Sequence, residues 1–396
     1  MIYRIRAWEQ VSGEHRPVGE MVCEISADGR AKGAFRYEKE YLERKDAFSI
    51  DPVSLPLKSE SFTIDNPGVF SAFEDSLPDD WGRRLLVRKH QIPRHEQNLP
   101  NLLIALGSSG LGALSYTEHG KPEPCQKDVS TLHLAELVDA AEKFESGEIQ
   151  ESEISLLLGA GSSPGGARPK VIVLDEDNDI HYLAKFPSIK DHVDVVKIET
   201  ATMSLAAKAG LIVPPTKLVQ CGNKSILLVK RFDIVPDGRR HMISFLTLLK
   251  AQGFYQLRYK DVLEAVRKYS NDPIADSELL FRQMVFNSII GNTDDHLKNF
   301  WMLYDRIQGW RLSPAFDLVP DIGDRGEHVL FFGLGAYYPG RKALETLGRK
   351  WGISNAANVV AQVFESVSAW KEEFSSFGVS ESDINRFRVI DKHISG

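Results

Sequence analysis

A polar segment, Gly291–Asn299 (GNTDDHLKN), constrains this sequence more than any other feature. It follows residues 278–290, whose apolar side chains recur at helical spacing. Two short strand-like runs, 299–304 and 310–312, come next, and Asp317 follows them. The sequence therefore predicts a polar loop after a helix, then a hairpin, then a second acidic position.

The spacing within this region matches a known chemical arrangement. In protein kinases one Asp orients the attacking hydroxyl, an Asn five residues later binds Mg²⁺, and a second Asp follows a short hairpin. Asp294, Asn299 and Asp317 have this order. Mg²⁺ prefers oxygen ligands, which explains the amide and the second carboxylate. Solvated loop residues are the alternative for any one position, but they do not explain the ordered set.

A glycine-rich segment, 159–170 (GAGSSPGGARPK), precedes two predicted strands, 171–174 and 180–186. Glycines let backbone N–H groups close on phosphate oxygens. The segment lacks the Gly-Lys-Ser/Thr ending of a Walker A loop. A flexible linker is the alternative, and the position before the strand pair favours a phosphate loop.

Lys185 is predicted to lie inside the second of these strands, among apolar residues. A lysine in such a place is costly unless it is paired, and kinases use one there to hold the nucleotide phosphates. An edge-strand lysine facing water is the alternative. Glu199, early on a helix predicted for 198–209, is its candidate ion-pair partner, or else a solvated charge on the helix face.

The segment Lys230–Asp233 ends the last predicted strand of the same unit. In a kinase this is the hinge, whose backbone holds adenine, so Lys230 and Phe232 are candidate nucleotide-binding residues. The alternative places Phe232 in the core and makes Arg231 and Asp233 a surface pair.

Residues 1–60 have a β-rich pattern, with strands predicted at 18–25 and 33–37 and an edge strand near 48–57 that carries two prolines. Residues 69–90 are predicted to be helical, and 117–130 is the best linker candidate. After Gly238 the chain is mostly helical apart from the hairpin described above. Residues 344–360 resemble a helix-turn-helix. We favour a role in packing within a helical lobe over direct DNA recognition.

Bulk properties exclude several classes of protein. The net charge of −7 does not demand a nucleic-acid partner, and three widely spaced cysteines support neither a zinc site nor a disulfide framework. No apolar run approaches the roughly 18–20 residues that span a bilayer. We expect a cytoplasmic protein that does not associate with a membrane.

These residues together resemble the HipA family of serine/threonine kinases. The family's signature, roughly TDxHxKN, appears as Thr293–Asn299 (TDDHLKN), its metal-binding segment as Leu312–Asp317 (LSPAFD), and its phosphate loop as Gly166–Lys170 (GARPK). The first 120 residues are similar too. The matching segments there are Val18–Glu20 (VGE), Ser54–Leu57 (SLPL) and Phe73–Gly82 (FEDSLPDDWG).

The resemblance implies an enzyme that transfers the γ-phosphate of ATP to serine, with Mg²⁺ as cofactor. It implies Asp294 as catalytic base, His296 and Lys298 near the transferred group, Asn299 and Asp317 as metal ligands, and Lys185 on the phosphates. The implied nucleotide-binding residues also include Gly165, Gly166, Ala167, Arg168, Lys230 and Phe232. Family members phosphorylate a serine of their own phosphate loop, and Ser163, or its neighbour Ser162, matches that position.

The resemblance also implies partners and a fold. The protein substrate would be an aminoacyl-tRNA ligase, and a HipB-like DNA-binding antitoxin would be the partner, so that DNA is contacted only through it. The expected fold is α+β: a bilobal kinase with a small α/β lobe (126–236) and a helical C-lobe (237–396), preceded by a β-rich domain (1–120). An inactive pseudokinase that serves as a binding module, and a small-molecule phosphotransferase, are the competing hypotheses.

Overall fold

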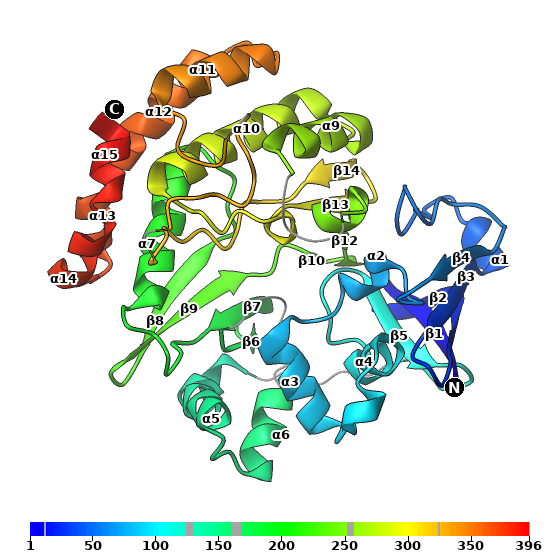
Figure 1. Ribbon diagram of the computed structural model, residues 1–396. Coiled ribbons are helices and arrows are strands. Elements are labelled where there is room, and N and C mark those ends of the chain that lie inside the picture. The colour runs from blue at the N-terminus through cyan, green and yellow to red at the C-terminus, as the bar shows by residue number, and fades with distance from the viewer. Residues whose placement is uncertain are drawn as a thin grey trace.

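The N-terminal part of the chain supplies most strands of an antiparallel sheet, drawn in blue and cyan in Figure 1, and β10 and β11 join it from later in the sequence. The computed structural model describes residues 1–11, 13–123, 130–159, 168–251, 257–323, 325–333 and 335–395. The strand order is β10-β11-β1-β2-β3-β4, and β5 pairs with β1. The strands are β1 (Ile2–Val11), β2 (Glu14–Ile25), β3 (Ala31–Tyr37), β4 (Phe62–Asp65), β5 (Leu114–Glu118), β10 (Ile234–Val235) and β11 (Gly238–Arg239).

The two strands predicted at 18–25 and 33–37 are confirmed as β2 and β3, but the edge strand predicted near 48–57 is wrong. This segment folds back on the sheet, because the Tyr37 hydroxyl accepts from the Ile50 amide and donates to the Leu55 carbonyl. Phe48, Ile50 and Leu55 are buried there. Hydrogen bonds to the Tyr37 side chain thus take the place of the strand pairing that the local sequence favoured.

The predicted helical stretch 69–90 is two helices, because Pro78 interrupts it. The helices of this region are α1 (Lys39–Leu42), α2 (Ser71–Glu74), α3 (Asp80–Lys89), α4 (Leu99–Leu106) and the 3₁₀ turn η1 (Arg94–Glu96). Trp81 and Leu85 of α3 are buried against residues of the next unit rather than against the N-terminal sheet.

The small lobe is a four-stranded antiparallel sheet in the order β6-β7-β9-β8. Its elements are η2 (Thr131–His133), α5 (Leu134–Ser146), α6 (Glu151–Gly159), β6 (Lys170–Asp175), β7 (Ile180–Lys185), α7 (Val195–Lys208), β8 (Thr216–Cys221) and β9 (Lys224–Lys230). Helices cover both faces (Figure 1): Leu228 packs toward α3 and α5, whereas Leu227 and Val229 pack on Val196 of α7. Burial on both faces explains the continuous apolar run in β9.

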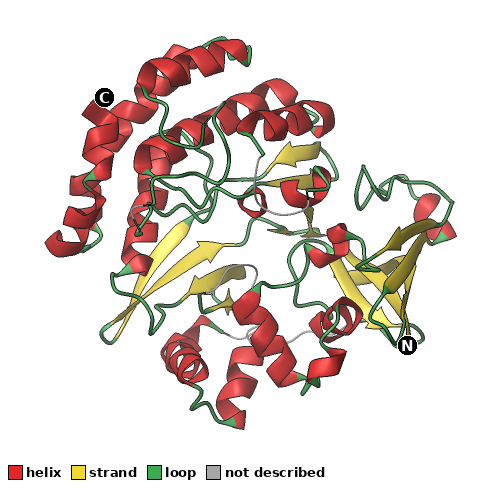
Figure 2. Cartoon of the chain, in the orientation of Figure 1, coloured by secondary structure: helices red, strands yellow, loops and turns green. Residues whose placement is uncertain are grey.

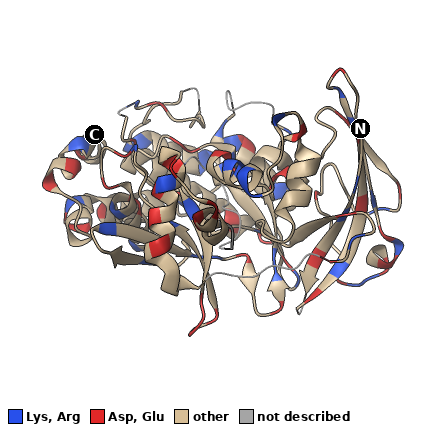
Figure 3. Ribbon diagram, turned by 90° about the horizontal axis from the view of Figure 1, so that it is seen from below, with Lys and Arg blue, Asp and Glu red and all other residues tan. Residues whose placement is uncertain are grey.

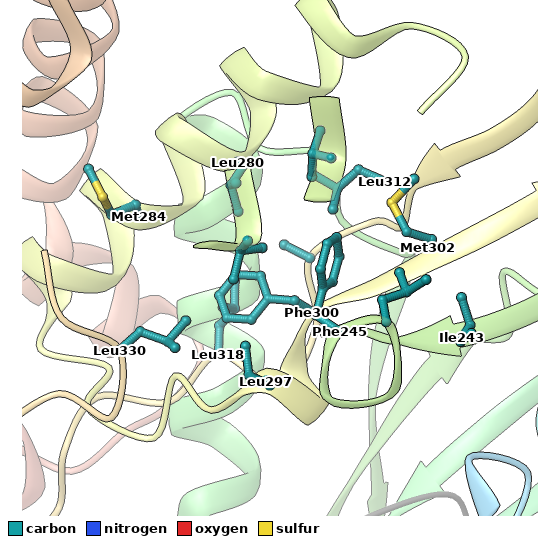
Figure 4. Close-up of a cluster of buried hydrophobic side chains, with 14 of the residues drawn as sticks. Ile243, Phe245, Leu280, Met284, Leu297, Phe300, Met302, Leu312, Leu318 and Leu330 are labelled. Atoms are coloured by element: carbon teal, nitrogen blue, oxygen red, sulfur yellow. The ribbon is translucent and has the colours of Figure 1, made fainter. Parts of the chain in front are cut away.

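The helical lobe is built around α10 and a three-stranded sheet in the order β12-β13-β14. Its first elements are β12 (His241–Ser244), α8 (Phe245–Leu248), α9 (Tyr259–Tyr269), α10 (Pro273–Ile290), η3 (Leu297–Asn299), β13 (Trp301–Asp305) and β14 (Gly309–Leu312). The predicted hairpin is confirmed, and β12 is an additional strand. Figure 4 shows part of the core of this lobe, to which Phe245, Phe300 and, from α10, Leu280 and Met284 contribute.

The chain ends in short helices that wrap the outside of the helical lobe (Figures 1 and 2). They are α11 (Arg341–Lys350), α12 (Ala356–Ser368), α13 (Trp370–Ser376), α14 (Glu381–Ile384), η4 (Asn385–Phe387) and α15 (Val389–Ser395). Leu344 and Val360 are fully buried, and a side chain at Gly348 would collide with Phe281 of α10. The packing role favoured for residues 344–360 is therefore confirmed.

The N-terminal sheet docks on the rest of the chain through hydrogen bonds to buried charged side chains. Arg306, in the β13–β14 turn, donates to Glu9, whose side chain is fully buried. The Asp233 carboxylate accepts from the backbone amide of Gly112, and the Arg231 guanidinium donates to the Gly110 carbonyl. Each of these contacts gives a buried charged side chain of one unit a hydrogen-bond partner from the other unit, and so contributes to holding the units together.

Basic and acidic positions are interspersed along the ribbon in Figure 3, in keeping with the modest net charge of −7. Among the helices that the structure describes, none has both the length and the apolar character needed to cross a membrane.

A buried carboxylate at the contact between α2 and β12 makes stability depend on pH. Burial raises the pKa of Asp75 from 3.8 to about 6, although the Ser244 amide and hydroxyl both donate to it. The folded protein therefore favours the protonated acid, and a penalty of about 2–3 kcal/mol develops as the pH rises from 4 to 6.

We expect Asp75→Asn to raise Tm by a few degrees relative to the parent protein at pH 7.5, because the amide keeps an acceptor for Ser244 without the buried charge. The difference should vanish at pH 4. Scanning calorimetry at both pH values measures it, and a variant less stable at pH 7.5 than the parent would contradict this view of Asp75.

Candidate active site

The centre of the cleft between the lobes is an ion-paired lysine. Lys185 Nζ lies 2.5 Å from Glu199 Oε1 and 2.7 Å from Asp317 Oδ1. Lys185 lies on β7 between two other strands and its residue is only 9% exposed, so the edge-strand alternative is wrong. Glu199 on α7 is buried as well, which confirms the ion pair predicted for it.

The pKa shifts of this group have clear causes. The two carboxylates outweigh the desolvation of the Lys185 ammonium and raise its pKa. Lys185 in turn lowers the pKa of Asp317 far below its usual range. Burial raises the pKa of Glu199, and the Lys185 charge opposes that effect. The ion pair between Lys185 and Asp317 therefore keeps these two groups charged at neutral pH.

A second lysine lies beside the first. Lys170 faces Lys185 across the β6–β7 pair and is only 5% exposed. Burial and the Lys185 charge lower its pKa. In the part of the chain that the structure describes, its ammonium has no ion-pair partner within 4 Å. No role was predicted for Lys170 from the sequence. Its position opposite Lys185 in the predicted hairpin could have indicated that the two lysines lie side by side.

The polar segment after α10 places its functional side chains in the same cleft. Gly291 ends the helix in the left-handed conformation, with φ +74°. Asp294 is exposed, and its Oδ1 lies 3.9 Å from Nε2 of His296. The Asn299 Nδ2 donates to the Asp294 carbonyl, which leaves the amide oxygen as an acceptor toward a further group.

The next residue, Asp295, anchors this loop from within. Its carboxylate accepts from the Tyr259 hydroxyl at 2.6 Å and the Val329 amide at 2.8 Å, and lies 2.9 Å from His328 Nδ1. It is fully buried, unlike its exposed neighbour Asp294. No role was predicted for Asp295, because its partners lie more than thirty residues away.

Asp317 has the unusual backbone of a functional position. Its φ of +56° lies in the left-handed region, which costs a residue with a Cβ roughly 1–2 kcal/mol. The ion pair with Lys185 compensates for that cost and directs the carboxylate into the cleft, between the two lobes.

Apolar side chains line one part of the cleft. Phe232 and Phe316 lie with ring centroids 5.9 Å apart, near Leu183, Met203 and Val229. Arg231 and Asp233 are buried, so the surface-pair alternative is wrong. The Lys230 and Arg231 amides donate to other backbone carbonyls.

The structure gathers most of the predicted site residues around this one cleft. The lining residues among them are Lys185, Lys230, Phe232, Asp294, His296, Lys298, Asn299 and Asp317. Arg168 is not among them: its exposed guanidinium pairs with Asp191. Ser162, Ser163, Gly165, Gly166 and Ala167 lie outside the described residues.

The oxygen ligands at this site suit a hard cation that is also coordinated by a phosphate. Within the described ranges no three His, Cys, Asp or Glu side chains form a site that could hold a metal alone. Mg²⁺ is usually held by one or two carboxylates together with substrate phosphates. Asn299 and Asp317 fit that pattern.

Two family descriptions match this chain. Residues 162–371 match the HipA-like C-terminal domain, and residues 11–117 match the HipA N-terminal domain. The chain belongs to the HipA family. A putative kinase of Sinorhizobium fredii is 26% identical over 93% of this HipA chain and 94% of its own length. The serine/threonine-protein kinase toxin HipA of Shewanella oneidensis is 24% identical over 76% of this chain and 72% of its own length.

The fold agrees with that assignment. The structure of a Shewanella oneidensis HipA, in complex with HipB and operator DNA, superposes on this HipA chain with a TM-score of 0.67. Sequence identity is 16%, and the match covers 100% of this chain and 96% of that one. The predicted HipA resemblance, α+β fold class and kinase class of enzyme are therefore confirmed.

Two adjacent aspartates of this HipA chain offer a matched test of the anchor. Asp295→Ala should lower the free energy of unfolding by roughly 3–5 kcal/mol, because it leaves Tyr259 and the Val329 amide without a buried acceptor. Asp294→Ala, at an exposed position, should change it by less than about 0.5 kcal/mol. Urea denaturation of both variants measures this, and equal effects would refute the anchoring role.

Proposed function

We propose that this chain is an ATP- and Mg²⁺-dependent serine/threonine protein kinase in which Asp294, Asn299, Asp317 and Lys185 perform the roles predicted for them. The observation that carries the proposal is their meeting in one cleft, with two buried lysines beside the metal-binding candidates. Such a site can work by positioning and charge neutralisation alone.

The nucleotide would enter between the lobes with adenine against the apolar side chains of the cleft, beside Phe232 and Phe316. Lys185 and Lys170 would then face its phosphates. Lys170 supports this, because a buried ammonium without an ion-pair partner gains most from an incoming anion. Bound Mg²⁺ would neutralise phosphate charge, with Asn299 and Asp317 as its protein ligands.

Asp294 is positioned to receive the proton of the attacking serine. Its carboxylate is exposed at the cleft, so a protein substrate can reach it. As the serine oxygen bonds to the γ-phosphorus, the bond to the β-phosphate oxygen breaks and ADP leaves. His296 and Lys298, on the same loop, would stabilise the transferred group.

The substrate and partners extend the proposal. The Shewanella HipA complex with HipB and operator DNA supports a HipB-like antitoxin as partner here, with DNA contacted through it. We propose an aminoacyl-tRNA ligase as substrate, self-modification at Ser163 or Ser162, and a toxin active in the cytoplasm. We also propose 1–120, 126–236 and 237–396 as the functional units.

The central test uses intact-mass spectrometry and ADP release after incubation with Mg²⁺ and ATP. We expect phosphate transfer or ATP turnover by the parent protein, and at least a roughly 100-fold loss in Asp294→Asn and Asp317→Asn. EDTA should abolish turnover, and Asp294→Asn should still bind ATP.

Turnover that survives both substitutions would refute the assigned roles. Nucleotide binding without any turnover by the parent protein would instead favour the pseudokinase, a binding module in an antitoxin–DNA complex.

A further inference from the structure

The loop from Asp75 to Trp81, here termed the bridge, joins the two lobes although it belongs to the N-terminal region. At one end the Asp75 carboxylate accepts two hydrogen bonds from Ser244, both at 2.8 Å, at the start of α8 in the helical lobe. At the other end Trp81 is fully buried in the core of the small lobe, with its ring 5.4 Å from that of Phe144. The bridge is thus fixed at both ends.

The middle of the bridge is held as well. Pro78 restricts the backbone, and its carbonyl accepts from Arg83 Nε at 2.8 Å. A second nitrogen of the same guanidinium donates to Glu74 at 2.9 Å. Asp79, the next residue along the bridge, therefore projects from a rigid support.

Asp79 reaches the catalytic loop. Its Oδ1 lies 2.8 Å from Nζ of Lys298, 219 residues further along the chain. Both side chains are about 30% exposed, at 31% and 28%, and line the same cleft as Asp294. A pair this open to solvent adds only about 0–1 kcal/mol to stability. The pair instead restricts where the Lys298 ammonium lies, because an unpaired lysine has a long stem with many rotamers.

We propose that Asp79 is a positioning residue, which fixes the Lys298 ammonium relative to both lobes and so completes the phosphate-transfer site from the N-terminal domain. This inference rests on the proposed function, because it assumes that Lys298 acts on the transferred group. It assigns the N-terminal domain a part in catalysis.

The alternative role for Asp79 is inhibition. Asp79 also acts on Lys170 through space, raising the pKa that burial lowers. A carboxylate among cations could occupy the place of a phosphate and inhibit the enzyme. The fixed ends of the bridge favour positioning, because an inhibitory group has to withdraw when the nucleotide binds.

The experiment compares Asp79→Asn with Asp80→Asn, which removes the same charge from the adjacent exposed residue. We expect Asp79→Asn to lower kcat at least about tenfold, with KM for ATP and Tm unchanged. Asp79→Glu should restore part of kcat, and Asp80→Asn should match the parent protein. Labelling of Lys298 by an amine-reactive reagent, followed by mass spectrometry, should increase several-fold in Asp79→Asn.

The other outcomes would overturn the inference. A tighter KM or a higher kcat in Asp79→Asn would show inhibition instead, and a parallel loss of Tm and kcat would show a structural role. Unchanged Lys298 labelling would show that the contact does not hold the lysine. Absence of turnover in the parent protein, with labelling still dependent on Asp79, would refute the kinase proposal, and with it the catalytic part of this inference.

Discussion

The ion pair of Lys185 with Glu199 and Asp317 is the interaction on which the rest of the cleft depends. Burying one ammonium and two carboxylates would cost several kcal/mol per ion if they were apart. Together they join β7, α7 and the segment after β14, which come from both lobes. Lys170 lies beside this group, paired in register with Lys185 across two strands. An incoming metal and phosphates would thus offer new partners to Asp317 and to the two lysines.

The N-terminal domain forms part of the cleft that the lobes enclose. Its backbone at Gly110 and Gly112 holds Arg231 and Asp233, a buried pair within the predicted hinge segment. Its bridge reaches from the helical lobe to the core of the small lobe. Replacing Trp81 by alanine there would cost roughly 3–5 kcal/mol. The relative position of the lobes is thus set in part by residues outside them.

The sequence predicted features whose determinants are local. Asp294, Asn299 and Asp317 lie on the predicted loop and after the predicted hairpin, because the flanking helix and strands have strong apolar patterns. Lys185 and Glu199 could be paired because a strand and the helix after it are adjacent in the chain. The strand expected near 48–57 failed because contacts with Tyr37, a distant residue, outweighed local propensity.

Other site features depend on long-range contacts that no local pattern records. Asp79 meets Lys298 across 219 residues, and Asp75 meets Ser244 across 169. Asp295 looks in the sequence like a second copy of Asp294, yet one is buried and the other exposed. Tyr259 of α9 and the 328–330 segment surround Asp295 and not Asp294, which distinguishes the two.

The most direct test of the account is a crystal structure with Mg²⁺ and a non-hydrolysable ATP analogue. We predict that Asp317 leaves Lys185 and ligates the metal at about 2.1 Å together with Asn299. Lys185 should keep Glu199 and turn to the phosphates, with Lys170 beside it. A nucleotide bound away from these lysines, or an Asp317 still paired with Lys185 and not ligating the metal, would contradict it.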